Sequence, residues 1–231
     1  IRRSDGYVGK PPELGTDVFT TAVRSSSTAP RYISNFPVDF ALYRNPSGTS
    51  DWFITNRLTG PQVLKTNTTE AEVENSDYAN FDHNNGYSNQ GGSGHQSWMW
   101  KRSAGFDVVA WEGENVQPGV IPHSLNKVPE MMWLKNRSNG DWEVYHKGLN
   151  GGSSPETYSI KLNESDAEAN ISRWYSTAPT STHFTVTKNS FNASNENYIA
   201  FLFASVDGIS KVGYYDGSGS SRTITTGFQP R

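Results

Sequence analysis

Large apolar residues alternate with other residues near the middle of the chain. Trp98 and Trp100 are two positions apart, which is the spacing that places side chains on one face of a strand. A second short apolar run, residues 108–111, follows after Gly105. This pattern predicts two short strands joined at a glycine.

The same order returns near the C-terminus. The run Tyr198-Ile-Ala-Phe201-Leu-Phe203 leads to Gly208, and Val212-Gly-Tyr214 follows it. Upstream, the hairpin sequence Asp51-Trp52 recurs as Asp141-Trp142, and Gly15-Thr-Asp17-Val18 echoes the residues after Gly105. Self-similarity in a preserved order indicates a tandem repeat.

The repeat divides the chain into four parts. We assign residues 1–30 to the end of a preceding repeat and a loop, 31–113 to a first repeat, 114–216 to a second, and 217–231 to the start of a third. Each full repeat offers six or seven short strands separated by turn residues, in roughly 80 to 100 residues, as antiparallel sandwiches do. The predicted fold is therefore all-β, with tandem antiparallel β-sandwich repeats of the jelly-roll or lectin-like type. Helix is expected at most as single turns within residues 69–73 and 166–170.

Composition narrows the classes of partner. Only 34% of the 231 residues are hydrophobic, but 13% are aromatic, so the core is expected to consist of a few large rings. A net charge of −3 does not favour nucleic-acid binding, and we expect no such partner. The chain has no cysteine and no apolar run of eighteen residues, so neither disulfides nor membrane insertion are expected.

The aromatic residues supply the candidate core and the candidate binding site. Alternation along residues 141–145 predicts that Trp142 points inward while Glu143 faces solvent. Trp174 and Tyr175 lie in a polar loop, where a ring could stack on a sugar, although a loop anchor is the alternative. The predicted structural core comprises Trp52, Trp98, Trp100, Trp142, Phe201 and Phe203.

The carboxylates do not indicate catalysis. Asp51 recurs as Asp141, and Glu72 as Glu168. A carboxylate that returns in every repeat is more typical of a turn or a helix cap than of an acid–base pair. The Asx-rich residues 82–86 do not match a calcium-binding EF-hand loop, and the five histidines lack metal-binding spacing. We therefore predict no enzymatic activity, no catalytic residue, no metal and no cofactor.

The repeated signature resembles tandem β-rich repeats in virion proteins of tailed phages, most closely those of marine phages that infect cyanobacteria. Residues 129–145, 163–168, 198–204 and 208–213 carry the likeness, and the first repeat carries it more loosely. It implies a structural virion component at the particle surface, such as a tail fibre, tail-associated or capsid appendage protein. Expected partners are other virion proteins and further repeats, in an oligomer. The alternative is a carbohydrate-binding adhesion module for host surface glycans. The family offers no established catalytic residues to carry over.

Overall fold

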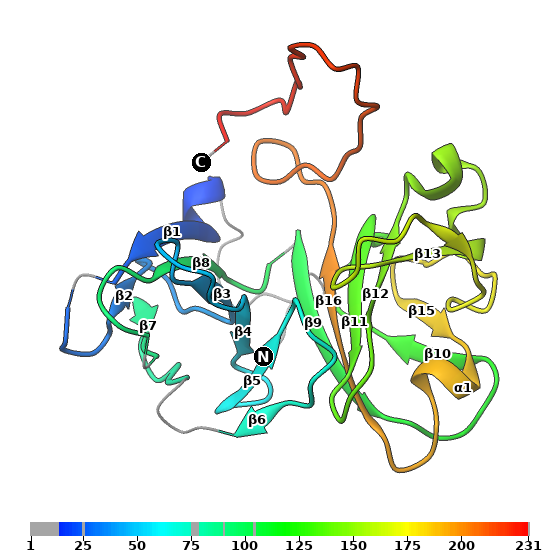
Figure 1. Ribbon diagram of the computed structural model, residues 1–231, viewed down its shortest axis with the longest axis horizontal. Coiled ribbons are helices and arrows are strands. Elements are labelled where there is room, and N and C mark those ends of the chain that lie inside the picture. The colour runs from blue at the N-terminus through cyan, green and yellow to red at the C-terminus, as the bar shows by residue number, and fades with distance from the viewer. Residues whose placement is uncertain (1–13, 25, 75–78, 90, 104, 231) are drawn as a thin grey trace.

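The regular secondary structure of the chain is almost all β, as predicted. The computed structural model describes residues 14–24, 26–74, 79–89, 91–103 and 105–230 (Figure 1). Its sheets are two of six strands and two of two strands. Among these described residues, helix is limited to α1 (Lys188–Phe191) and the 3-10 turns Gly15–Asp17, Leu149–Gly152 and Pro155–Thr157. No helix within the described residues is long and apolar enough to cross a membrane.

The first unit, residues 15–103, contains one large and one small antiparallel sheet. In main sheet 1 the strand order is β1-β8-β3-β4-β5-β6, and small sheet 1 pairs β2 with β7. The strands are β1 (Phe19–Val23), β2 (Tyr32–Ile33), β3 (Phe40–Arg44), β4 (Phe53–Asn56), β5 (Gln62–Lys65), β6 (Val73–Glu74), β7 (Gly86–Tyr87) and β8 (Gln96–Trp100).

The second unit, residues 105–207, repeats that order strand by strand. Main sheet 2 runs β9-β16-β11-β12-β13-β14, and small sheet 2 pairs β10 with β15. The strands are β9 (Phe106–Glu112), β10 (Gly119–Pro122), β11 (Met131–Asn136), β12 (Trp142–His146), β13 (Tyr158–Lys161), β14 (Ala169–Asn170), β15 (His183–Val186) and β16 (Asn197–Phe203). The single helical turns considered for residues 69–73 and 166–170 are absent, since those segments lead into β6 and β14.

Each unit begins with the strand that closes its main sheet. β1 pairs with β8, placing Phe19 opposite Trp100, and β9 pairs with β16, placing Phe106 opposite Phe203. Phe19 thus occupies the position of Phe106, whereas the sequence echo aligned Val18 with Val108. The repeat boundaries assigned from the sequence, after residues 30 and 113, separate β1 from β8 and β9 from β16. Similarity between two stretches of sequence identifies a repeat, but it does not identify which strands are hydrogen-bonded to each other. Residues 1–13 of the segment assigned to a preceding repeat lie outside the described residues.

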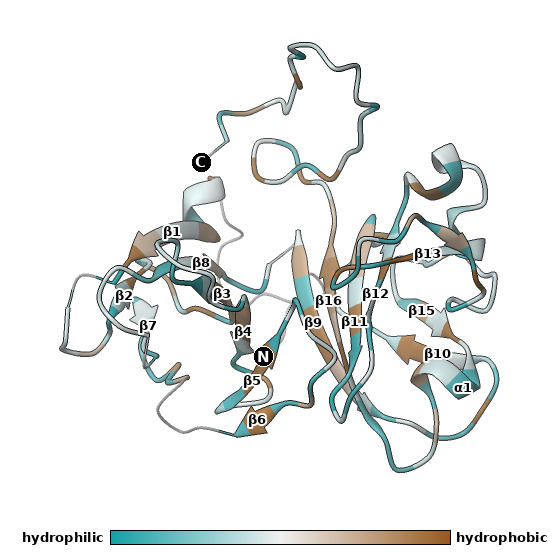
Figure 2. Cartoon of the chain, viewed as in Figure 1, coloured by the Kyte–Doolittle hydropathy of each residue, from teal (hydrophilic) through white to brown (hydrophobic). Residues whose placement is uncertain are grey.

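The four sheets form successive layers, with the two main sheets facing each other in the middle (Figure 1). Alternation along each strand supplies both faces of a main sheet. In β16, Ile199, Phe201 and Phe203 join the core shared by the main sheets, while Tyr198, Ala200 and Leu202 join the core under small sheet 2. Apolar residues accordingly concentrate on the central strands β9, β16 and β11 in Figure 2.

The layering corrects one prediction about β12. Glu143 does not face solvent: it is only 5% exposed, and Tyr145 on the same face is 4% exposed. Main sheet 2 is covered on both faces, so an inward Trp142 leaves no solvent-facing side for its neighbours. The Glu143 carboxylate accepts hydrogen bonds from Arg173 Nε at 2.9 Å and from the Ser159 hydroxyl, which offsets the cost of burying its charge.

Separating the units is expected to destabilise both. A cut after Ser103 keeps each main sheet whole but exposes the core between them, so we expect each piece to melt on the order of 20 °C below the full chain. A cut after Glu114 also removes β9 from β16, and we expect that second piece not to fold. Thermal melts followed by circular dichroism test both. If the pieces cut after Glu114 have the same melting temperature as the parent chain, the two units do not stabilise each other.

Candidate functional site

We call the interface between the two main sheets the seam. Aromatic rings run across it from the first unit to the second. The ring of Phe40 lies 4.7 Å from that of Phe201 and 5.3 Å from that of Phe106, while Phe106 lies 5.2 Å from Phe203. Ring pairs at these separations add to the energy of area burial. The seam is thus a hydrophobic core to which both units contribute.

Polar bonds join the units at the rim of this core. Trp142 Nε1 donates to Lys65 O of the first unit at 2.8 Å. Lys135 Nζ donates to Thr69 O of the first unit at 3.1 Å and to Gly140 O of its own unit. Arg137 Nε and Glu72 Oε2 form an ion pair at 2.7 Å. These directional contacts fix the position of one main sheet relative to the other. Apolar packing alone is less directional and would allow more than one relative position.

A cavity of about 340 Å³ lies at one end of the seam. The rings of Phe19, Trp100, Phe106, Trp133 and Phe203 line it, together with Phe228 and Pro230 from the C-terminal residues. The polar and charged residues Lys101, Ser103, Ser210 and Lys211 also line it.

This lining suits an apolar group better than a sugar. Each sugar hydroxyl needs a hydrogen-bond partner once water is removed. The Ser210 hydroxyl is already engaged, because it donates to Ala204 O at 2.7 Å. An apolar side chain or hydrocarbon group would fill the space without leaving buried polar atoms unpaired.

The recurring aspartates fasten the same strand ends in both units. Asp51 accepts from Asn67 Nδ2 at 2.9 Å and pairs with Lys65 Nζ at 3.0 Å, while Asn67 Oδ1 accepts from Trp52 N at 3.0 Å. These hydrogen bonds from Asn67 and Lys65 lower the pKa of Asp51.

The second unit reproduces this arrangement atom for atom. Asp141 accepts from Asn163 Nδ2 at 2.8 Å and pairs with Lys161 Nζ at 2.7 Å, while Asn163 Oδ1 accepts from Trp142 N at 2.8 Å. The bonds from Lys161 and Asn163 lower the pKa of Asp141. A carboxylate held ionised in this way is poorly suited to act as a general acid.

The recurring glutamates also have structural contacts, but different ones. Glu72 pairs with Arg137 across the seam, whereas both carboxylate oxygens of Glu168 accept from Asn150 N, at 3.0 and 2.9 Å. Within the described part of the chain, no group of three or more His, Asp or Glu side chains could hold a metal ion.

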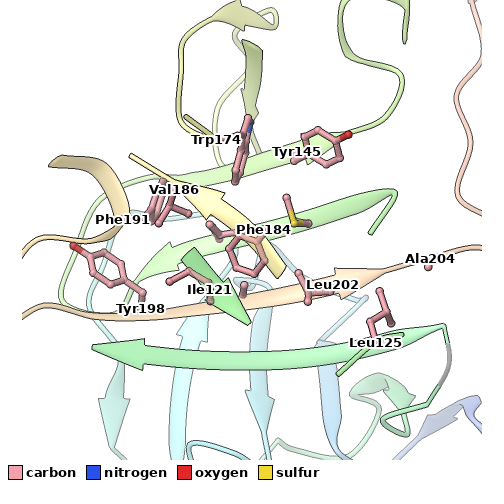
Figure 3. Packing of buried hydrophobic residues seen from close by; sticks show 13 residues of the cluster. Ile121, Leu125, Tyr145, Trp174, Phe184, Val186, Phe191, Tyr198, Leu202 and Ala204 are labelled. Atoms are coloured by element: carbon pink, nitrogen blue, oxygen red, sulfur yellow. The ribbon is translucent and has the colours of Figure 1, made fainter. Parts of the chain in front are cut away.

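The two glycan-binding candidates point in different directions. Trp174 is 1% exposed, its Nε1 donates to Tyr158 O at 2.8 Å, and its ring lies edge-on to Tyr145 inside the core (Figure 3). A ring so enclosed offers no face to a sugar. Tyr175 is 39% exposed and has a positive φ of 52°, so its ring remains available at the surface.

The candidate core residues divide between full and partial burial. Trp142 and Phe201 are 0% exposed, and Phe203 is 9% exposed. Trp52, Trp98 and Trp100 are half-buried. Trp100 lines the cavity, while the Trp52 and Trp98 rings lie 5.3 Å apart with the Arg44 guanidinium 4.8 Å from the Trp52 ring.

The buried Lys135 predicts a pH dependence of stability. Burial lowers its pKa to about 8 from a usual value of 10.5, although the charge of Asp141 opposes this shift. Between these pH values the folded chain has lost the proton that the unfolded chain still holds, so the free energy of unfolding rises with pH. We expect a gain of about 2 kcal/mol between pH 8 and 10, reduced by the two carbonyls that favour the charged form.

Urea unfolding at several pH values measures this gain. Methionine does not titrate, so the free energy of unfolding of the Lys135→Met variant should not rise between pH 8 and 10. Tyrosines such as Tyr145, whose pKa burial raises to about 12, destabilise the fold only above pH 10. Parallel curves for the parent chain and Lys135→Met would contradict the prediction.

The cavity and the seam are the features that sequence reasoning missed. Their lining combines residues from β1, β8, β9, β11 and β16 with residues near the C-terminus. The sequence did contain one indication that main sheet 2 is covered on both faces. The run of β16 is apolar without interruption after Asn197, whereas a strand with one solvated face would alternate apolar and polar residues. No residue pattern indicates which sheet covers that second face.

Comparison with known proteins places the chain in a family. No curated protein and no solved structure matches it. One family model, described as a domain of unknown function (DUF7483), matches residues 15–231, which starts at the beginning of the first structural unit and includes both units. The chain therefore belongs to the DUF7483 family.

Proposed function

We propose that this chain is a structural component of a phage virion, such as a tail fibre, tail-associated or capsid appendage protein. The proposal draws on the resemblance of the repeated signature to virion repeats. It places the protein at the particle surface, in an oligomer with other virion proteins. No catalytic role is part of it.

The observation that carries the proposal is the use of the recurring residues. Asp51 and Asp141, with their asparagine and lysine partners, fasten strand ends in both units. The recurrent sequence thus stabilises each β-unit. Such a design favours a load-carrying element over an enzyme, in which a site would normally be unique.

Purified particles test the proposal directly. Peptide mass spectrometry of density-banded phage should detect the chain in a fixed ratio to the major capsid protein. Antibody against residues 105–207 should decorate one part of intact particles in negative-stain images. Absence from washed particles, together with presence in the infected-cell lysate, would overturn the proposal.

A second candidate function is glycan recognition on the host surface. The rings of Trp52 and Trp98 are only half-buried, with Arg44 beside Trp52, and this favours glycan recognition because a ring that reaches solvent can stack on a sugar. Tyr175 is a separate exposed ring. A glycan array probed with the parent chain, Trp98→Ala and Tyr175→Ala tests this function. Binding that both variants retain, or no binding at all, would contradict it.

A further inference from the structure

The residues that follow β16 repeat the beginning of the second unit. We call residues 208–230 the C-terminal segment. Counted from Gly208, its Val212 and Tyr214 stand where Val109 and Trp111 stand when counted from Gly105. The latter two residues belong to β9. None of residues 208–230, all of which are described, lies in a strand or helix.

The first strand of a unit has a constant role. β1 and β9 each pair with the last strand of the unit that they begin. The C-terminal segment therefore has the sequence of such a first strand. The last strands β8 and β16 are already paired on both sides, so neither can receive it.

A turn further along the segment gives a second, independent match. In the first unit the Ser34 hydroxyl donates to Phe36 O across Asn35, whose φ is 65°. In the C-terminal segment the Thr226 hydroxyl donates to Phe228 O across Gly227, whose φ is 85°. Phe36 is 4% exposed, in the core under small sheet 1.

The segment already has this local structure, and its Val212 is 9% exposed in the core shared by the main sheets, but other large side chains of the segment lie open to solvent. Tyr214, Tyr215 and Ile224 are 58%, 66% and 53% exposed. By contrast, Trp111 stacks on Tyr198 at 5.5 Å and its Nε1 donates to Phe191 O at 3.0 Å.

The start of the segment is held against the second unit. Tyr214 packs so closely on Gly148 that a Cβ there would lie 2.3 Å from its ring. The Tyr214 ring also lies edge-on to that of His146 at 6.2 Å.

We infer that the C-terminal segment forms the first part of a further β-sandwich unit. Residues 209–215 supply the edge strand, and residues 226–228 supply the turn that leads into the core. The partner is a unit of this same repeat that lacks its own first strand and continues the chain on the C-terminal side. Main-chain hydrogen bonds give the pairing its affinity, and Val212 and Tyr214 give it register. This inference is independent of any location on a virion.

A fusion tests the inference with the full chain. The second unit has the same positive-φ turn position at Asn126, whose φ is 57°. Arg231 follows Gly227 by four residues, as Glu130 follows Asn126, so a copy of residues 131–207 is joined directly after Arg231. The copy lacks the equivalents of both β9 and β10, so it must take its first strand from the C-terminal segment. Hydrogen exchange at the Tyr214 amide should slow by about 100-fold or more relative to the original chain. The slowing should be smaller at the Val212 amide, which already donates to Ser205 Oγ at 3.0 Å.

A matched fusion supplies the control. It joins a copy of residues 105–207, which brings its own first strand, and there the two amides should exchange as in the original chain. Unchanged exchange in the first fusion overturns the inference, whether or not the added residues fold.

Two point variants separate strand pairing from incidental contact. In the first fusion, Tyr214→Asp puts a carboxylate at the position of the half-buried Trp111 ring, which packs against the core, so the added unit should lose its cooperative melting transition. Tyr215→Asp occupies the exposed position of Glu112 and should leave that transition unchanged. Equal effects of the two variants would also overturn the inference.

Discussion

Replacing Trp142 by alanine is expected to lower the free energy of unfolding by about 3–5 kcal/mol. The side chain is 0% exposed, and its ring lies 6.2 Å from that of Phe201 in the shared core. Truncation removes this apolar contact, leaves a cavity and deprives Lys65 O of its donor. Because that donor bond crosses the seam, both units should be affected. Urea unfolding of the full chain measures the loss.

Trp52 provides a matched control at the same place in the first repeat. It is half-buried, so Trp52→Ala should cost about 1–2 kcal/mol. Equal losses at the two positions would contradict the asymmetric packing described above. A Trp142→Ala protein with unchanged melting but lost glycan binding would instead place this ring in a binding site.

Replacing Asp107 by alanine is expected to cost about 3 kcal/mol. Asp107 is 1% exposed and accepts from Ser124 N at 2.8 Å, from Val108 N at 2.9 Å and from Arg102 Nε. Its removal leaves two main-chain donors and a guanidinium without their acceptor. We place the cost at the low end for a broken buried pair because the Arg102 side chain is 35% exposed and can reach water.

Glu70→Gln is the control for this charge change. Its side chain is 58% exposed and pairs with Lys65 at the surface, so the loss should stay below about 1 kcal/mol. Thermal and urea unfolding of both variants under the same conditions compare the two effects. An Asp107→Ala loss as small as that of Glu70→Gln would show that water replaces the buried acceptor.

The recurring polar residues show how far a single sequence can be read. Asp51 before Trp52 recurs as Asp141 before Trp142, and this recurrence indicated a structural role. The structure gives that role as a bonded set of side chains that closes a strand end twice. The partner lysines, Lys65 and Lys161, escaped notice because a lysine in a strand is unremarkable until its neighbour is known.

Trp174 shows the opposite case. Its neighbours in sequence are polar, so the segment reads as a surface loop, yet the ring is enclosed by Tyr145 and the strands around it. The local backbone explains the difference, since Tyr175 and Ser176 have positive φ values of 52° and 47°. This backbone turns Tyr175 outward while Trp174 points inward. Composition alone does not contain that information.

The sequence by itself determined the strand content, the turns and the tandem order, because these depend on alternation and on residues with local backbone preferences. It also indicated Trp142 and Phe201 as core residues. Only the tertiary structure decided that the main sheets face each other, that Glu143 is buried, and that β1 and β9 close the sheets that follow them. Alternation assigns residues to two faces of a strand, but it does not state whether water or another sheet lies against each face. What covers each face depends on contacts between residues far apart in the chain. The same long-range contacts form the cavity, which is lined by both units and the C-terminal segment.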